Sequence, residues 1–256
     1  MPLLEELTTR RAAEAFEECE VAVLPTGSTE QHGPALPLST DFKAAEAVAR
    51  AVADRPDTVV LPTLPVGISD HHRQFHGTLW VPPETFERYV ADTLRSVTGH
   101  GIRKAVVVNG HGGNVGALRN VGKELYREET AFAVPWSWWE GVDDAPEEVL
   151  GEGVEVPGHA GGFESALMCH VAAALVEEER LEEAETGQGE PRWSDDAAPG
   201  GFDFVDVTEN GTKGEPTRAS AEAGEALLDA SAGALGDLIG WLADRPFEEL
   251  RPRPHR

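Results

Sequence analysis

Residues 20–55, EVAVLPTGSTEQHGPALPLSTDFKAAEAVARAVADR, combine a strand, a loop and a helix in one short stretch. The apolar run 20–27 has the length of a buried strand. Residues 41–55 repeat alanine and valine at helical spacing behind Asp41, a residue type that favours the N-cap. Between the two, a loop punctuated by glycine and proline carries Glu30 and His32. Because ligands of α/β proteins bind just beyond the carboxyl ends of strands, this stretch predicts both the fold class and the place of a site.

The same alternation continues along the chain. Further strands are expected at 57–62, 104–110 and 130–138, and helices at 82–101, 114–129, 160–179 and 216–245. Strands that alternate with helices of this length indicate a mostly parallel sheet with helices on both faces, a three-layer α/β/α sandwich. We expect one domain over residues 1–256, with a mobile acidic excursion at 177–201, where the sequence is rich in glutamate, glycine and proline.

Acidic residues dominate the charge of the chain. It has 46 Asp and Glu against 21 Lys and Arg, a formal net charge of −25. A field of that sign repels phosphate backbones and anionic lipids, so we expect no nucleic-acid partner and no membrane partner. Such a surface is typical of proteins from a salty, halophilic cytoplasm, with an ordinary acidic bacterial protein as the alternative.

Cysteine use and the N-terminal pattern predict a cytoplasmic location. Cys19 and Cys169 lie far apart in apolar surroundings, which indicates buried free thiols in a reducing compartment. The N-terminus lacks the basic and then apolar pattern of a signal peptide, and no apolar run approaches 18 residues. We therefore expect a soluble cytoplasmic protein without a membrane-spanning segment.

Histidine and carboxylate side chains follow each expected strand. They are Glu30, His32 and Asp41 after the first, Asp70, His71, His72 and His76 after the second, His111 after the third, and His159 and Glu164 after the fourth. Taken singly, Asp41 could simply cap its helix and His111 could be a structural histidine. Because the carboxyl ends of parallel strands meet at one edge of a sheet, the convergence of four such clusters favours a metal site.

Five of these side chains form the candidate ligand set. They are Glu30, His32, Asp41, His111 and Glu164. Imidazoles and carboxylates without thiolates suit Zn²⁺, Mn²⁺ or Fe²⁺ rather than a structural cysteine-type zinc site. The set exceeds what one catalytic ion needs, so it predicts two divalent ions that share a bridging carboxylate and a water molecule. Such a pair of ions is suited to hydrolysis.

Three tryptophans lie between the third and the fourth cluster. Trp136, Trp138 and Trp139 occur together in the segment PWSWWEG. They are either core aromatics or a substrate-binding platform that stacks on a flat ligand. The sequence leaves both interpretations open.

Four motifs together resemble the creatininase (creatinine amidohydrolase) family. They are LPTGSTEQHGPALPLSTD (24–41), VNGHGGN (108–114), GHAGGFES (158–165) and NGTKGEPTRASAEAGEALL (210–228). The resemblance extends from about residue 4 to residue 245. It implies a three-layer α/β/α fold, a two-metal centre, hydrolysis of a non-peptide C–N bond in a small-molecule amide, and a homo-oligomer, often a hexamer.

The resemblance also implies roles for the ligands. Glu30, Asp41 and His111 match the ligands of one ion. His32 and the bridging Asp41 match ligands of the other ion. Asp41 is therefore expected to contact both ions.

The chain departs from the creatininases proper at one position. Those proteins carry a glutamate two residues after the histidine of N-G-H, where this chain has Gly113. Members with the Gly-Gly form supply a carboxylate from H-A-G-x-x-E, which assigns Glu164 to the second ion as a catalytic carboxylate. His159 matches a family histidine suited to pass a proton to the leaving nitrogen, and His72 matches a position that contacts substrate.

The Gly-Gly form and the acidity favour one activity within the family. Its archaeal members remove formate from a formamidopyrimidine nucleotide in riboflavin and deazaflavin synthesis, and we expect such a formamide deformylase. The alternatives are a creatinine amidohydrolase and a peptide-trimming hydrolase of redox-cofactor maturation. An isomerase that uses the same ions and a metal-dependent binding protein without turnover are further alternatives.

Overall fold

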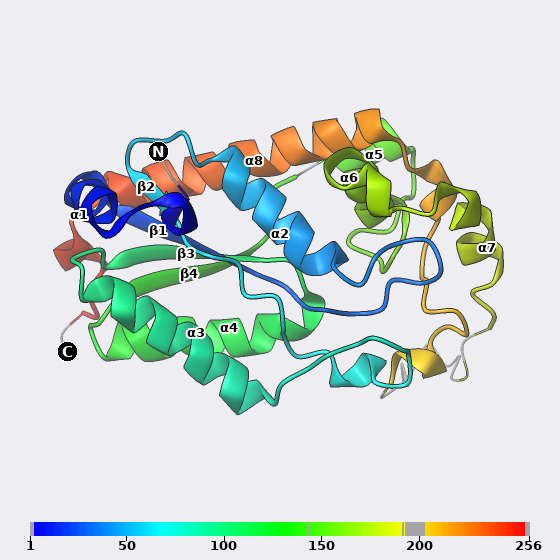
Figure 1. Ribbon diagram of the computed structural model, residues 1–256, viewed down its shortest axis with the longest axis horizontal. Coiled ribbons are helices and arrows are strands. Elements are labelled where there is room, and N and C mark those ends of the chain that lie inside the picture. The colour runs from blue at the N-terminus through cyan, green and yellow to red at the C-terminus, as the bar shows by residue number, and fades with distance from the viewer. Residues whose placement is uncertain (1–2, 143, 191, 193–202, 254–256) are drawn as a thin grey trace.

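Four parallel strands form the central sheet of the computed structural model, which describes residues 3–142, 144–190, 192 and 203–253 (Figure 1). The strands are β1 (Val21–Thr26), β2 (Thr58–Val60), β3 (Lys104–Asn109) and β4 (Phe132–Ser137). Their order in the sheet is β2-β1-β3-β4, and every pairing is parallel. The predicted parallel sheet is confirmed, with strand bounds that differ from the expected ones by at most two residues at each end.

Helices cover both faces of this sheet (Figure 1). On one face lie α2 (Thr40–Ala51), α6 (Gly162–Val171) and α8 (Ala221–Ala243), and on the other lie α3 (Pro83–Thr98) and α4 (Val115–Arg127). The N-terminal helix α1 (Thr9–Glu18) packs on the second face through Ala15. The three-layer α/β/α architecture predicted from the sequence is therefore present.

Alternate side chains of β1 enter the two cores. Val21 and Val23 pack with α2, α6 and α8, whereas Ala22 and Leu24 pack with α3 and α4. All six residues of β1 are buried, as a strand covered on both faces requires. Each fully buried valine or leucine contributes about 1.5–3 kcal/mol relative to exposure, so the two cores fix the sheet that positions the site.

Short helices complete the described chain. They are α5 (Ala145–Leu150) and α7 (Leu181–Thr186), with the 3₁₀ turns Leu4–Glu6, Asp70–His72, Gly112–Asn114, Ala173–Leu175, Glu178–Arg180, Phe204–Asp206, Pro216–Arg218 and Phe247–Leu250. The first part of the expected acidic excursion is thus helical, with Ala184 buried. Residues 191 and 193–201 of that excursion lie outside the described residues.

Two expected helices have different bounds. The helix expected at 160–179 ends at Val171, and the one expected at 216–245 begins at Ala221, where the Ser220 side chain accepts a hydrogen bond from the backbone N–H of Ala223. By length and composition α8 is apolar enough to cross a membrane, contrary to the sequence expectation. One such helix is weak evidence for a span, and α8 packs on α6 and α2 through a buried face that includes Leu227.

Candidate metal centre

The predicted side chains converge where the strand order reverses. From β1 the chain moves to β2 on one side, and then crosses to β3 on the other, so β1 and β3 are neighbours with connections that leave in opposite directions. Such a switch point leaves a crevice beyond the carboxyl ends of the two strands. Glu30 and His32 follow β1 there, and His111 follows β3.

Asp41 lies between the two histidines of the ligand set. Its Oδ1 is 3.0 Å from Nε2 of His32, and its Oδ2 is 3.0 Å from Nδ1 of His111. The prediction that Asp41 caps α2 was wrong, because the helix begins at Thr40 after the N-cap Ser39. The carboxylate therefore does not cap the helix, and each of its two oxygens faces one of the two histidines.

Close backbone approach brings Asp41 to this position. A side chain at Gly27 would collide with the backbone of Asp41 and Phe42, and one at Gly110 would collide with the carbonyl oxygen of Asp41. The glycines that follow β1 and β3 thus let the first turn of α2 rest directly on the strand ends. Local packing explains why glycine is required at both places.

Hydrogen bonds on the far side of each ring set the tautomers of the two histidines. Nδ1 of His32 donates to the carbonyl oxygen of Glu30 at 3.0 Å, and Nε2 of His111 donates to the carbonyl oxygen of Ile68 at 2.9 Å. When the rings are neutral, as metal ligands must be, Nε2 of His32 and Nδ1 of His111 present lone pairs toward Asp41. Such outer hydrogen bonds are the usual way in which proteins orient histidines as metal ligands.

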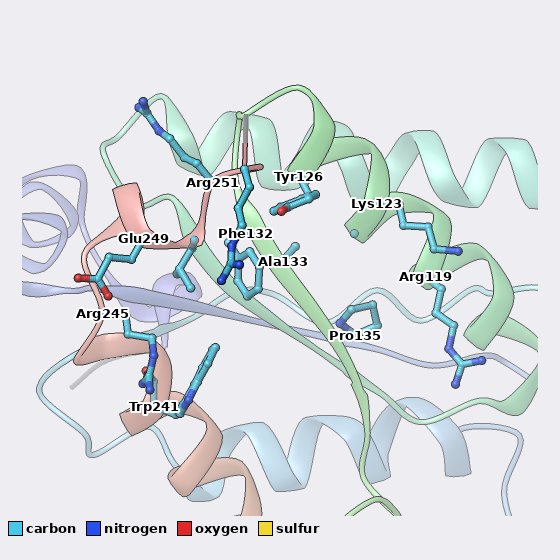
Figure 2. A pocket seen from close by; sticks show the side chains of 13 residues that line it. Arg119, Lys123, Tyr126, Phe132, Ala133, Pro135, Trp241, Arg245, Glu249 and Arg251 are labelled. Carbon is cyan, nitrogen blue, oxygen red and sulfur yellow. The ribbon is translucent and has the colours of Figure 1, made fainter. Parts of the chain in front are cut away.

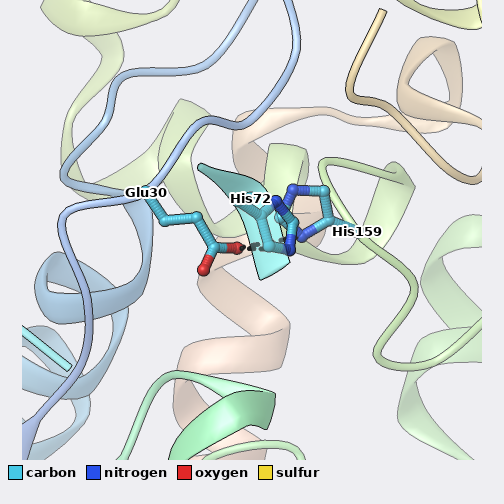
Figure 3. A group of neighbouring side chains, drawn as sticks. All are labelled: Glu30, His72 and His159. Atoms are coloured by element: carbon cyan, nitrogen blue, oxygen red, sulfur yellow. Dashed lines mark ion pairs between the residues drawn. The ribbon is translucent and has the colours of Figure 1, made fainter. Parts of the chain in front are cut away.

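Glu30 faces three histidines. Its Oε2 is 3.2 Å from Nδ1 of His111, and its Oε1 is 3.3 Å from Nε2 of His72 and 3.6 Å from Nδ1 of His159 (Figure 3). Burial raises the pKa of Glu30 to about 7, with the charge of Asp41 acting in the same direction and His111 opposing it. A buried carboxylate of this kind favours a nearby cation strongly.

Glu164 occupies the first turn of α6 at the edge of this cluster. Its Oε2 accepts a hydrogen bond from the backbone N–H of Ala160 at 2.6 Å and lies 3.7 Å from Nε2 of His32. The carboxylate thus stands on the His32 side of Asp41, where the sequence placed the second ion. Gly113 supplies no side chain on the other side.

Charge coupling dominates the metal-free centre. Burial lowers the pKa of His111, but Glu30 and Asp41 outweigh it and raise that pKa to about 9. The pKa of His32 is likewise raised by Asp41 and Glu164 against the effect of burial. Burial raises the pKa of Asp41, yet His32 and His111 bring it below its usual value. Protons hold the carboxylates and imidazoles together in this state, and a divalent ion that bound here would displace them.

Buried polar atoms and the types of ligand atom in this cluster both fit divalent metal ions. Glu30 Oε2, His32 Nε2 and Asp41 Oδ2 are buried and make no hydrogen bond of regular geometry among the described residues, although ring nitrogens and carboxylate oxygens face one another at 3.0 to 3.2 Å. Four groups could each hold an ion, namely Glu30–His32–Asp41, His32–His159–Glu164, Glu30–His71–His111 and Glu30–His72–His159. Oxygen and imidazole nitrogen are the donors that Zn²⁺ and Mn²⁺ accept. The structure therefore brings the whole predicted ligand set together.

His159 and His72 line the wall opposite Asp41. Nε2 of His159 donates to the backbone carbonyl of Gln31 at 2.9 Å, which turns Nδ1 toward Glu30. Nδ1 of His72 accepts from the Gln31 side-chain amide at 2.8 Å. Burial and the neighbouring histidines lower the pKa of both rings, so both are neutral at pH 7.

Two residues of the site, Gln31 and Phe204, escaped the sequence prediction, and His71 was named there without a role. The Gln31 side-chain amide donates to His72 and its backbone carbonyl accepts from His159. The ring of His71 stacks on that of His111 with centroids 5.6 Å apart, and Phe204 stacks on His72 at 4.3 Å. Gln31 could have been found, because it stands between two predicted ligands. Phe204 comes from a turn remote in sequence, and no local pattern marks it.

Only one of the three tryptophans lines the cavity. The cavity holds about 270 Å³ and is bordered by Trp139, Phe204, Pro157 and the metal-binding side chains. Trp138 is fully buried and stacks on Phe163 at 4.3 Å, and Trp136 is also in the core. The core interpretation therefore holds for Trp136 and Trp138, whose predicted contact with a ligand is not supported, while Trp139 remains a candidate substrate contact.

Comparison with known proteins identifies a matching family and several similar proteins. The family described as "Creatininase: Creatinine amidohydrolase" matches residues 5–239. The mycofactocin precursor peptide peptidase of Mycobacterium tuberculosis is 34% identical over 244 residues, which span 90% of this chain and 88% of that protein. The creatinine amidohydrolase of Pseudomonas putida is 30% identical over 255 residues, 91% of this chain and 94% of that protein.

The archaeal relative matches a shorter part. The 2-amino-5-formylamino-6-ribosylaminopyrimidin-4(3H)-one 5'-monophosphate deformylase of Methanothermobacter thermautotrophicus is 35% identical over 119 residues. That match spans 46% of this chain and 49% of the deformylase. The similarity to the deformylase is therefore partial.

Solved structures with the same fold include metal-bound creatininases. A crystal structure of creatinine amidohydrolase superposes with a TM-score of 0.80 at 27% identity, and the match covers 95% of this chain and 98% of that one. Two further creatininase structures, described as the Mn form and as a variant of Zn–Zn type, match 98% of this chain with TM-scores of 0.78 at 27% and 28% identity. Because the family match spans most of the sequence and the buried histidine and carboxylate groups could hold metal ions, the chain belongs to the creatininase family and is a metal-dependent hydrolase.

Proposed function

We propose that this chain is a two-metal peptidase that trims a precursor peptide, the alternative that the sequence left beside the deformylase. The observation that carries this proposal is the 34% identity to a mycofactocin precursor peptide peptidase over 90% of the chain. The deformylase expectation has weaker support, because its match spans 46% of the chain. Creatinine ring opening is disfavoured by Gly113, which stands where creatininases proper carry a glutamate.

The ligand set divides into two halves around Asp41. Glu30, Asp41 and His111 would hold one ion, and His32, Asp41 and Glu164 would hold the other. Two divalent ions in this place supply a water molecule of lowered pKa and polarise the carbonyl of the bond to be cleaved. Asp41 fixes the spacing of the two halves, because each of its oxygens faces a different histidine.

His159 is placed to move the proton that hydrolysis requires. Water adds across the C–N bond: its oxygen joins the carbonyl carbon, one proton goes to the leaving nitrogen, and the C–N bond breaks. The Nδ1 atom of His159 carries a lone pair toward Glu30, and burial followed by the charge of His32 lowers its pKa. A neutral imidazole at this position can accept the proton from water and pass it to the nitrogen.

The mouth of the cavity has walls suited to a peptide rather than to a compact polar ring. Trp139, Phe204 and Pro157 line the cavity, and the chain neighbours of the last two, Val205 and Val156, have exposed fractions of 42% and 38%. Apolar side chains of a peptide on either side of the scissile bond would find contacts there. The buried ligand set and the apolar mouth together support cleavage near one end of a peptide.

Three candidate substrates test this proposal side by side. Purified protein loaded with Zn²⁺ or Mn²⁺ is incubated with mycofactocin precursor peptide, with creatinine and with the formamidopyrimidine nucleotide. We expect mass spectrometry to show two peptide fragments whose masses add up to the precursor plus one water, and none with the Asp41→Asn variant. Formate or creatine release with an intact peptide would overturn the proposal, as would bound metal with no turnover of any substrate.

A further inference from the structure

A second cavity lies along the outer edge of the sheet. β4 is the last strand in the order β2-β1-β3-β4, so within the described chain its outer edge pairs with no other strand. A cavity of about 720 Å³ lies beside it, between α4 and residues 241–253 (Figure 2). This cavity, here called the β4 groove, has the size of a small-molecule site, for which about 300–1,000 Å³ is usual. It shares no lining residue with the metal centre.

The charge of the β4 groove is opposite to that of the chain. Five of its lining residues are cations, namely Arg119, Lys123, Arg245, Arg251 and Arg253, and only Glu249 is acidic. The whole chain has 21 cations against 46 acidic residues. A concave place that reverses this balance concentrates anions from solution.

Most of these cations have no internal anion to neutralise them. Arg245 stacks over Trp241 at 4.1 Å and donates to its carbonyl oxygen, and Arg251 lies 3.9 Å from a carboxylate oxygen of Glu129. The other three, Arg119, Lys123 and Arg253, make no hydrogen bond or ion pair with any residue that the structure describes. Their charge is available to an external partner.

Two of the free cations share one face of α4. Arg119 and Lys123 are four residues apart, so their side chains emerge on the same side of the helix, and both residues line the groove. Arg119 offers a planar guanidinium that pairs with two oxygens of a carboxylate, sulfonate or phosphate, and Lys123 offers a mobile point charge beside it. The two cations together suit a ligand with one acidic group rather than one whose negative charges are spread along its length.

Aromatic side chains provide the apolar wall of the β4 groove. Trp241 is 44% exposed although it is one of the largest apolar side chains, and Tyr126 and Phe132 line the same cavity. Figure 2 shows Trp241 and Arg245 on the opposite side of β4 from Arg119 and Lys123. A flat ligand body would bury this exposed aromatic surface and gain stacking with it.

The exposed strand itself is closed to an added peptide strand. Phe132 donates its N–H to Arg103 just before β3, and Trp138 donates to Asn109 at the end of β3. The backbone nitrogen atoms of residues 133, 135 and 137 therefore lie on the outer side of β4, away from β3. Pro135 has no N–H, and the N–H of Ser137 donates to the side chain of Glu140. A ladder of backbone hydrogen bonds cannot form here, which favours a small ligand over an extended peptide.

We propose that the β4 groove binds a small organic anion that has a flat aromatic body and one carboxylate, sulfonate or phosphate group. The body lies against Trp241, Tyr126 and Phe132, and the acidic group pairs with Arg119 and Lys123. The binding site is separate from the metal centre and independent of the reaction that the metal centre performs.

The fluorescent anion 8-anilinonaphthalene-1-sulfonate is a suitable probe, because it joins an aromatic body to a sulfonate. It is titrated into the full-length, metal-loaded protein, and the Arg119→Glu and Lys123→Glu variants are compared with Arg127→Glu. Arg127 is an exposed cation of the same helix that does not line the groove, so its replacement makes the same change of net charge. We expect about tenfold weaker binding for each groove variant, as for loss of a charged hydrogen bond, and less than about twofold for Arg127→Glu.

Two further measurements locate the probe. Energy transfer from tryptophan to bound probe should fall in Trp241→Phe, and the neutral analogue N-phenyl-1-naphthylamine should bind the wild type and the two groove variants equally. Equal weakening in Arg127→Glu, or unchanged energy transfer in Trp241→Phe, would overturn the proposal. A mass change in sedimentation velocity that is abolished by Arg119→Glu would also overturn it, since the groove would then be an interface between copies of the chain.

Discussion

No side chain fits between Gly113 and His71. A Cβ atom at Gly113 would lie 3.0 Å from Cε1 of His71 and 2.5 Å from Nε2 of His111, and it would also collide with the carbonyl oxygen of Ile68. The resemblance places a glutamate here in creatininases proper, whereas in this chain the Ile68 carbonyl and the rings of His111 and His71 surround the position. A glutamate introduced at residue 113 alone would therefore require these groups to move.

We expect Gly113→Ala to disturb the half of the centre that contains His111. The added methyl group must displace the His111 ring or the Ile68 carbonyl to which the ring donates. Loss of this outer hydrogen bond lowers metal affinity by about 10–100-fold. The matched control is Gly112→Ala, whose Cβ would meet nothing within 4 Å. Metal titration by calorimetry checks the pair, and equal affinities in both variants would contradict the steric argument.

Asp41→Asn should remove both ions while the fold persists. The substitution keeps the shape of the side chain but removes the negative charge that faces His32 and His111 at 3.0 Å on either side. Elemental analysis of the dialysed variant should find almost no metal, with a far-UV circular dichroism spectrum like that of the wild type. Asp229→Asn, an exposed carboxylate change on α8, should keep the full metal content. Full metal content in Asp41→Asn would rule out the bridging role.

Glu164→Gln should release about half of the metal. Glu164 stands beside His32 only, 3.7 Å from Nε2, so the half of the site formed by Glu30 and His111 keeps its ligands. Elemental analysis is compared with that of Glu179→Gln, a change at an exposed glutamate beyond the end of α6. An unchanged ratio of metal to protein in Glu164→Gln would remove this residue from the ligand set.

The sheet and the main ligands were predictable because their causes are local. The strand at 21–26 is fully buried on both faces, so its apolar run stands out, and parallel strands bring their carboxyl ends to one edge. Glu30, His32 and His111 follow those ends directly. Position after a strand was sufficient to place them.

The other features of the site depend on contacts between segments that are far apart in the sequence, so no short sequence pattern reveals them. Asp41 carries a residue type that caps helices, and only the approach of α2 to Gly27 and Gly110 turns its carboxylate to the centre. The role of Gln31 appears only when His72 and His159 are brought together from loops 87 residues apart in sequence. Phe204 enters the site from a turn of a segment whose composition is acidic and irregular.

Metal affinity should rise with pH. In the metal-free protein the pKa of His111 is about 9 and that of Glu30 is about 7, so both hold protons below these values. A metal ion must displace them, and each proton released makes the association constant rise about tenfold per pH unit. We expect a steeper rise below pH 7, where both titrate, than between pH 7 and 9. Calorimetry in buffers of different ionisation enthalpy counts the protons, and zero protons at pH 6 would contradict the predicted linkage.

We expect replacement of Trp138 to lower the stability of the protein and replacement of Trp139 to weaken substrate binding. Trp138 is fully buried against Phe163, so Trp138→Ala leaves a large cavity and lowers the free energy of unfolding by about 3–5 kcal/mol. Trp139 lines the cavity and is only partly buried against the core, so Trp139→Ala should raise KM for the peptide with a smaller loss of stability than Trp138→Ala. Urea unfolding and steady-state kinetics on the two variants serve as controls for each other. Equal stability of both variants, or an unchanged KM in Trp139→Ala, would show that the division between core and cavity is misplaced.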